Sequence, residues 1–269
     1  MVKNYHIHNG TLNRFPVVID LPHSGTRITN EMTKALLPNA ILANTDWFLK
    51  ELYHFLPEMG FTVIENNLNR YLIDPNRDPN EDLTGDYYHL VYAKNTFGHP
   101  LYKRPLTSTE INNRLMGFYQ PYHDQLQQLL ENKRNVFGSA LLIDLHSFAE
   151  YTHPSLNPTA DIVLGNDFNR TTSKKTFNYF QRLFTQRQYS VANNFPFRGG
   201  YITRHYGSQK GIFSIQIELR YKKYIEDRYF DEEILTHWDP IIFNHAQLQL
   251  QQVFKTLASD LDNGQLFFN

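Results

Sequence analysis

The chain has 269 residues, a formal net charge of −1, 41% hydrophobic residues and no cysteine. This length suits one large α/β domain or two small ones. The nearly neutral charge argues against nucleic acid or a membrane surface as a partner, since both need a basic excess. The lack of cysteine excludes disulfides, thiol nucleophiles and cysteine-bound zinc, so a metal would need His, Asp or Glu ligands.

The sequence shows neither a targeting segment nor a membrane span. The first residues lack the apolar stretch of a signal peptide, and no run of about 18 apolar residues occurs. We therefore expect a cytoplasmic protein. No linker, repeat or low-complexity stretch divides the chain, so residues 1–269 are predicted to form a single domain.

Short apolar runs alternate with longer segments of helical periodicity. The runs predict strands at 16–21, 62–66, 141–145, 161–164 and 212–219. Helices are predicted along the apolar stripes at 47–56 and 111–129, and over 172–186 and 238–261. Strands that alternate with helices of this length indicate a mixed or parallel sheet flanked by helices.

Two segments depart from this regular pattern. Pro121 lies inside the stripe at 111–129, where we expect it to kink the helix or break it in two. Segment 67–103 is irregular and too long for an ordinary connector, and such loops usually carry function or are disordered. Its aromatic residues favour an ordered, packed loop; they are Tyr71, Tyr87, Tyr88, Tyr92, Phe97 and Tyr102.

Two predicted strands are followed by nearly the same polar signature, a His-Ser pair that begins at His23 in one case and at His146 in the other. Ligands of open α/β sheets bind outside the carboxyl ends of the strands, so both histidines can face one crevice. Neutral imidazole is the commonest metal ligand. The pattern therefore indicates a divalent metal site, zinc by preference. The alternative is that each histidine is only a hydrogen-bonded polar residue.

A third ligand is harder to assign. Catalytic zinc usually has three protein ligands and one open position. Asp46 precedes a predicted helix, so it could be this ligand or merely cap the helix. Asp20 and Asp144 precede the two histidines and are candidates to orient the imidazole rings.

The predicted strand at 212–219 alternates between apolar and polar residues, and its polar face carries Ser214, Gln216 and Glu218. Glu218, at the end of this strand, would project towards the same rim as the histidines. In a metal hydrolase such a carboxylate takes a proton from the attacking water. The alternative is an ion pair with Arg220 or Lys222.

The long loop carries Arg70 and Arg77, and arginine binds carboxylates through a bidentate fork. The alternative is that Asp74 and Asp78 pair with Arg77 in a turn. A second loop contains Gly199 and Gly200, which allow close backbone approach to a ligand. That loop could equally be an ordinary turn. His6 and His8 are expected to lie on the surface without a structural role.

Together these blocks resemble the N-formylglutamate amidohydrolases, relatives of the zinc carboxypeptidases and aspartoacylases. The resemblance runs from Pro16 to about Tyr229 and keeps the order of the blocks. The blocks are Pro22-His23-Ser24-Gly25, Thr45-Asp46-Trp47, Asn69-Arg70, Asp74-Pro75-Asn76-Arg77, Pro121-Tyr122-His123, Ile143-Asp144-Leu145-His146-Ser147, Asn194-Phe195-Pro196 with Gly199-Gly200, and Ile217-Glu218. The resemblance implies a single-domain, zinc-exopeptidase-like (phosphorylase/hydrolase-like) α/β fold with a central mixed sheet flanked by helices.

The resemblance also implies roles for individual residues. His23, His146 and, as our assignment, Asp46 would bind one Zn²⁺ per chain. Glu218 would be the general base, and Arg70 would bind substrate or polarise the scissile carbonyl. The implied substrate-binding residues are Arg70, Asn76, Arg77, Asn194, Gly199 and Gly200, with Asn76 and Arg77 on the α-carboxylate. Pro75 departs from the aliphatic residue expected there, so the loop and the specificity could differ.

The implied reaction is hydrolysis of N-formyl-L-glutamate to formate and L-glutamate by a zinc-activated water, as a step of histidine degradation. One alternative is a zinc-dependent deacylase or peptidase that acts on another N-acylated acidic amino acid. The other is a non-catalytic binding protein of the same fold. The expected partner is a small acidic N-acyl amino acid, with no nucleic acid and no membrane.

Overall fold

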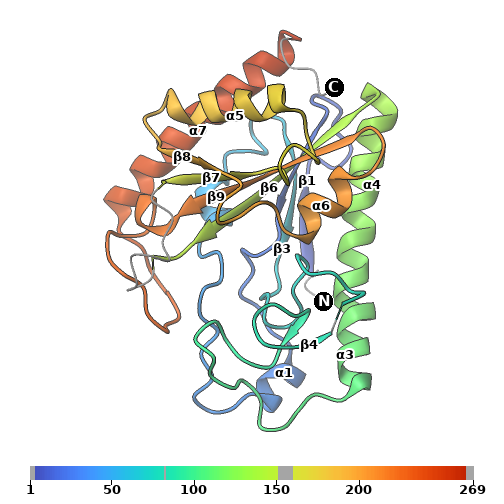
Figure 1. Cartoon of the computed structure of the whole chain (residues 1–269), viewed down its shortest axis with the longest axis vertical. Helices are drawn as coiled ribbons and strands as arrows, with labels where there is room; N and C mark the ends of the chain where they lie inside the picture. The colour runs from blue at the N-terminus through green and yellow to red at the C-terminus, as the bar shows by residue number, and fades with distance from the viewer. Residues whose placement is uncertain (1–3, 82, 151–159, 265–269) are drawn as a thin grey trace.

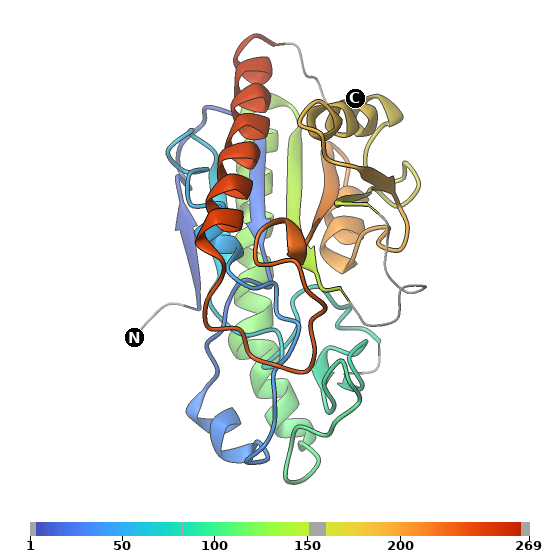
Figure 2. The same ribbon diagram turned by 90° about the vertical axis from the view of Figure 1, so that its left-hand side faces the viewer.

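The structure, a computed structural model, describes residues 4–81, 83–150 and 160–264 (Figure 1). A seven-stranded sheet with the order β1-β3-β2-β6-β9-β7-β8 forms its centre. Helices α4 and α6 pack on one face of this sheet, and α5 and α7 cover the other. Figure 2 shows α7 running along its face of the sheet. The predicted fold class, a mixed sheet between layers of helices, is confirmed.

The sheet is mixed because its edges run against its centre. Strands β2, β3, β6 and β9 are parallel, β1 is antiparallel to β3, and β7 is antiparallel to β9 and parallel to β8. Their bounds are β1 Tyr5–His8, β2 Val17–Leu21, β3 Thr62–Asn66, β6 Ala140–Phe148, β7 Ile162–Gly165, β8 Val191–Asn193 and β9 Ile212–Arg220. A separate pair of short strands, β4 Thr84–Gly85 and β5 Val91–Tyr92, lies in the long loop.

All five predicted strands are present, whereas β1 and β8 were not predicted. β8 has only three residues, too few for a recognisable pattern. β1 contains His6 and His8, and the His8 ring lies 3.2 Å from Glu65 on β3. The expectation that the pair has no structural role was therefore wrong for His8, whereas His6 is exposed on the surface as expected.

The helices match the predicted segments less closely. Their bounds are α1 Asn30–Ala35, α2 Leu49–Leu52, α3 Ser108–Arg114, α4 Gln120–Phe137, α5 Lys174–Thr185, α6 Tyr201–Gly207 and α7 Pro240–Asp262. The stripe at 47–56 yields only the single turn of α2, which Phe48 precedes in a left-handed conformation. α7 begins at Pro240, which needs no N–H partner there, and the Asp239 carboxylate caps its first turn.

The helical path is not broken at Pro121. A π-helical turn, Leu115–Tyr119, joins α3 directly to α4, and Pro121 lies in the first turn of α4. Proline has no N–H, so a regular helix would lose one backbone hydrogen bond at this position. The wider hydrogen-bond spacing of the preceding π turn accommodates this loss. Of the two outcomes expected at Pro121, a kink or a break, the break was therefore wrong, and the helical irregularity lies next to this residue.

Alternate residues of the central strands supply two separate cores. Val17, Ile19 and Leu21 of β2 face the layer of α5 and α7, whereas Val18 faces α4 and α6. The long loop is also packed, as predicted, because Tyr71 and Tyr92 are fully buried there; Tyr88, in contrast, is exposed. No helix among residues 4–81, 83–150 and 160–264 is long and apolar enough to cross a membrane.

Candidate active site

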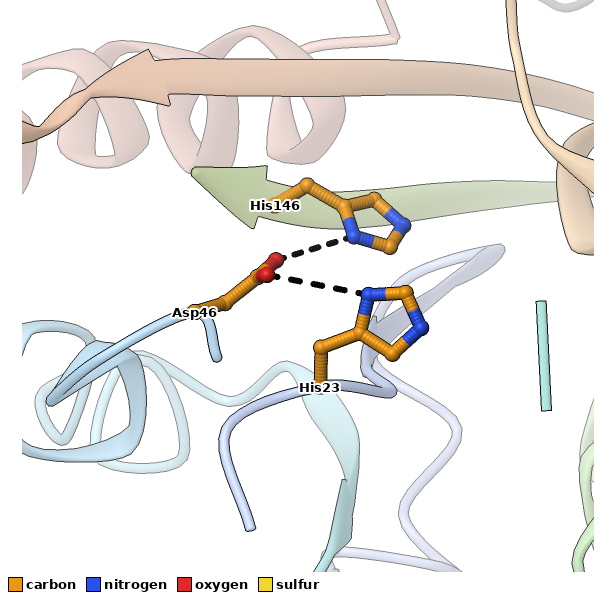
Figure 3. A group of neighbouring side chains, drawn as sticks. All are labelled: His23, Asp46 and His146. Atoms are coloured by element: carbon orange, nitrogen blue, oxygen red, sulfur yellow. Dashed lines mark hydrogen bonds and ion pairs between the residues drawn. The ribbon is translucent and has the colours of Figure 1, made fainter. Parts of the chain in front are cut away.

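His23, Asp46 and His146 lie together at the carboxyl ends of β2 and β6 (Figure 3). His146 belongs to β6, His23 follows β2, and Asp46 comes from the segment before α2. All three are buried, and one ligand atom of each lies within 4.8 Å of the others. The structure thus brings together the three residues proposed as ligands from the sequence.

The two rings present the same nitrogen to the carboxylate. Nδ1 of His146 lies 3.0 Å from one oxygen of Asp46, and Nδ1 of His23 lies 3.7 Å from the other. In a tetrahedral zinc site with bonds of about 2.1 Å, ligand atoms are about 3.4 Å apart. The two observed separations, each to a different oxygen of Asp46, bracket that spacing, and a single ligand atom from each of the three residues lies within 4.8 Å of the others.

The fit to a metal is supported by one unpaired atom. Among the described residues, the buried Nδ1 of His23 has no hydrogen-bond partner. A buried polar atom without a partner is costly, so it calls for a partner such as an ion. Two imidazole nitrogens and one carboxylate are also the donor set of many catalytic zinc sites. The residues therefore fit a single divalent cation.

Asp46 does not cap the following helix. The cap position of α2 is Phe48, which makes no side-chain cap bond. Instead, Asp46 accepts hydrogen bonds from His146 Nδ1 and from the backbone N–H of Ser147. The geometry therefore favours the ligand interpretation of Asp46 over the helix cap.

Carboxylates also face the outer nitrogen of each ring. His23 Nε2 lies 2.7 Å from Asp74, and His146 Nε2 lies 2.8 Å from Asp144. Such carboxylates orient metal-binding imidazoles and raise their basicity. The interpretation of Asp144 agrees with this arrangement, but that of Asp20 was wrong. Asp20 points into the α4 layer, where it accepts a hydrogen bond from the Tyr122 hydroxyl.

The site is strongly polarised. Burial opposes ionisation of Asp46, but His23 and His146 outweigh it and hold the pKa of this carboxyl below its usual range. Burial likewise opposes protonation of His146, yet Asp144 and Asp46 raise the pKa of its ring well above the usual value. These carboxylates thus favour the protonated ring when no metal is bound, and a metal would compete with that proton.

Glu218 lies beside His146, because the register of β6 and β9 pairs these two residues. Its carboxylate accepts a hydrogen bond of 2.7 Å from Gln216 Nε2. Burial raises the pKa of Glu218 to about 8, with His146 opposing the shift and Asp46 adding to it. Arg220, offered above as an alternative partner, lies 2.6 Å from Glu150 instead.

Lys222, the other alternative partner, also contacts Glu150, at 3.5 Å. Gln216, which we did not single out for function, accepts a hydrogen bond from the backbone N–H of Gly200. It thereby connects the strand of Glu218 to the start of α6. Its place on the polar face of an alternating strand was the signal that could have revealed it.

The two arginines of the long loop differ in their surroundings. Arg70 is buried, lies 2.7 Å from Asp74, and has a further nitrogen 3.5 Å from Asp46. The Arg77 side chain is 21% exposed, and its Nη1 atom lies farther from Asp74, at 3.7 Å. Both guanidinium groups lie over the ring of Tyr87, at 4.8 and 5.8 Å from its centroid. The turn pairing of Arg77 with Asp74 is thus present but long.

Asn76 lies between the metal ligands and α6. Its Nδ2 is 3.1 Å from His146 Nε2, and its Oδ1 accepts a hydrogen bond of 2.8 Å from the backbone N–H of Ile202. A Cβ atom on Gly200 would come within 2.3 Å of this amide. Gly200 is thus the residue that lets α6 start close to Asn76.

Asn194 and Gly199, which were also predicted to bind substrate, stabilise loop conformations. The Asn194 side chain accepts from the backbone N–H groups of Asn166 and Phe168 in the turn after β7. Gly199 has a φ of 116°, a left-handed conformation that glycine adopts without strain. None of these contacts involves the three candidate metal ligands, so a direct role of Asn194 or Gly199 in substrate binding stays a prediction.

Fold and site together define an α/β protein with a buried His-Asp-His group that could hold a metal ion, beside a glutamate. The chain belongs to the N-formylglutamate amidohydrolase family, whose profile matches residues 15–225. It is 32% identical over 235 residues to the N-formylglutamate deformylase of Pseudomonas putida, with 84% of this chain and 87% of the relative covered.

Two further similarities agree with this family. The N-formylglutamate deformylase of Pseudomonas aeruginosa is 30% identical over 228 residues, with 80% of this chain and 84% of the relative covered. The crystal structure of N-formylglutamate amidohydrolase from Ralstonia eutropha JMP134 superimposes with a TM-score of 0.83 at 24% identity, covering 98% of this chain and 100% of that one. The structural similarity supports the fold.

Proposed function

We propose that this protein is a metal-dependent amidohydrolase that hydrolyses N-formyl-L-glutamate to formate and L-glutamate, with residues 1–269 acting as one catalytic domain. The observation that carries the proposal is the buried His23–Asp46–His146 group beside Glu218. The names of the Pseudomonas relatives supply the substrate. The reaction would serve histidine degradation in the cytoplasm, as the family resemblance implies.

A divalent ion held by His23, Asp46 and His146, zinc by preference and one per chain, would supply Lewis-acid chemistry that polarises the formyl group and activates water. In its ionised form, which a nearby cation would favour by lowering the raised pKa of this buried carboxyl, Glu218 would take the proton of the attacking water and deliver it to the leaving nitrogen. The Arg70 guanidinium points towards Asp46 at 3.5 Å and would stabilise negative charge on the formyl oxygen.

Recognition of the acidic substrate falls to the loop that carries Asn76 and Arg77. Arg77 is the more exposed arginine of the pair, so its guanidinium is the one available to form a fork with a carboxylate. Asn76 would contribute its amide beside it. Asn194, Gly199 and Gly200 would contact the substrate from the neighbouring loops, and the bond from the Gly200 N–H to Gln216 would keep the start of α6 close to the site.

A metal analysis combined with an assay for formate release tests the proposal. The purified protein should hold about one zinc per chain and release formate from N-formyl-L-glutamate. His23→Ala and His146→Ala should each abolish both properties, because each variant keeps only two of the three protein ligands. His6→Ala removes an exposed histidine and serves as the matched control.

Two results would contradict these assignments. Stoichiometric zinc in the His23→Ala/His146→Ala double variant would place the metal elsewhere. A zinc-loaded wild-type protein that cleaves N-acetyl-L-glutamate faster than the formyl compound would point to a deacylase of a different N-acylated acidic amino acid.

A further inference from the structure

The π-helical turn and α4 place two side chains against the loop of residues 74–77. His123 Nε2 lies 2.9 Å from the carbonyl oxygen of Pro75. The Tyr119 hydroxyl donates a hydrogen bond of 2.9 Å to the carbonyl oxygen of Arg77. The two rings also contact each other, with centroids 4.2 Å apart and planes tilted by 34°. Tyr119 and His123, which lie one turn apart on the same helical path, therefore bind the carbonyl groups on both sides of Asn76.

The chemistry of these contacts fixes the state of His123. A carbonyl oxygen can only accept, so Nε2 of His123 must carry a hydrogen; Nδ1 lies 2.9 Å from the Tyr206 hydroxyl, which also donates to the backbone oxygen of His123 at 3.1 Å. Burial lowers the pKa of His123 to about 4, so the ring is neutral at neutral pH. It is a fixed donor to the loop and has no proton to exchange with substrate.

The residue between the two held carbonyl groups is Asn76, which reaches His146 Nε2 with its side chain. Its backbone N–H donates to Asp74 at 2.7 Å, and Asp74 contacts the outer nitrogen of His23. A shift of this short loop would therefore disturb the outer contacts of both candidate metal-binding histidines.

We propose that Tyr119 and His123 are positioning residues that hold the loop of residues 74–77 in its working geometry. By fixing the carbonyl groups of Pro75 and Arg77, they keep Arg77 ready for the substrate carboxylate and keep the loop in contact with both histidines. The part about substrate rests on the proposed function; the part about the histidines does not.

Tyr119→Phe tests the substrate part, because it removes one hydroxyl and keeps the ring. One lost hydrogen bond predicts a rise in KM for N-formyl-L-glutamate of about 3- to 10-fold, with kcat nearly unchanged. Tyr179→Phe is the matched control, since it removes a hydrogen bond of 2.7 Å to Asp260 that links α5 to α7. Equal KM values in the two variants, with equal losses of thermal stability, would mean that Tyr119 only packs.

Zinc affinity tests the part about the histidines without any activity assay. His123→Leu keeps the volume and removes the donor, and we expect about 10-fold weaker zinc binding in a chelator competition. His123→Gln places an amide N–H near the position of Nε2 and should restore most of the affinity. If the leucine variant does not fold, zinc affinities of Tyr119→Phe and Tyr179→Phe decide between the alternatives in the same way.

The outcomes separate this inference from the proposed function. Wild-type zinc affinity in His123→Leu, or no rescue by His123→Gln, would overturn the positioning role. A wild-type enzyme that does not act on N-formyl-L-glutamate would instead overturn the proposed function, and the zinc comparison would still decide the role of His123.

Discussion

At the scale of single residues, the carboxylate of Asp46 is the centre of the site. It lies between the Nδ1 atoms of two histidines, and its pKa is held low by both rings. An ionised carboxylate at this place attracts a cation and simultaneously favours a protonated His146 when no cation is bound. Proton and metal thus compete for the same group of atoms, so zinc affinity should fall as the pH falls.

Glu218→Gln tests the general base. The variant keeps the size and one hydrogen-bonding oxygen but cannot take a proton, so kcat should fall by about 10²- to 10⁴-fold. Zinc content should not change, because Glu218 is not one of the candidate ligands. Glu65→Gln, on strand β3 near the other edge of the sheet, is the control. A variant that loses zinc would make Glu218 a ligand, and one with normal kcat would leave the reaction without its base.

Arg77→Ala tests charge recognition. Loss of a charge-assisted hydrogen bond costs about 1.5–3 kcal/mol, which corresponds to about a 10- to 100-fold rise in KM for N-formyl-L-glutamate. An uncharged formamide should be affected much less. Arg187→Ala removes an exposed arginine beyond α5 and should leave both values unchanged. Equal losses on the charged and uncharged substrates would show that Arg77 is structural.

At the scale of elements, the sequence was informative where a strand is buried on both faces. β6 and β9 stand out as continuous or alternating apolar runs, and the polar residues that end them were correctly expected at one rim. α6 was not predicted, because this short helix depends on packing against β9 and on the close approach of Gly200 to Asn76.

The contacts of Asp74 could not be derived from local pattern either. This aspartate orients His23 from a loop, across a separation of 51 residues, and a tertiary contact of that kind leaves no periodic signal. The nearby sequence suggested Asp20 instead, since it lies in the strand that His23 follows. A strand residue, however, points to a sheet face, and the face of Asp20 is covered by α4.

Gly200→Ala tests the close approach of α6 to the loop. The added Cβ would meet the Asn76 amide at 2.3 Å, so either the amide or the start of α6 must shift. We expect a loss of about 1–3 kcal/mol in unfolding free energy and a clear decrease in kcat/KM. Gly117→Ala is the control, because nothing lies within 4 Å of the added Cβ atom there. Unchanged activity in Gly200→Ala would mean that the contact is not required.

At the scale of the whole molecule, the candidate ligands connect segments that are far apart in the chain. A metal bound by His23, Asp46 and His146 would join the start of the chain to its middle. Because the unfolded chain cannot offer this arrangement, binding should stabilise the folded state alone.

Removal of the metal should therefore lower the melting temperature. Zinc at about 100 times its Kd contributes about 2.7 kcal/mol, and for a domain of this size that corresponds to about 5–10 °C in Tm. Thermal unfolding after chelation and after zinc addition measures the difference. The His23→Ala/His146→Ala double variant should show no such shift. An equal shift in that variant would indicate zinc binding at other residues.

The strand order has a further consequence for the newly synthesised chain. β7 and β8 are made before β9, yet β7 joins the sheet only by pairing with β9, and β9 also pairs with β6. Until Ile212–Arg220 leaves the ribosome, β6 presents an open edge of apolar residues, and β7 can pair only with β8, apart from the rest of the sheet. Glu218 arrives on the same strand. The sheet is therefore completed at the same time as the proposed base enters the site. A chain released earlier would expose a sheet edge prone to aggregation.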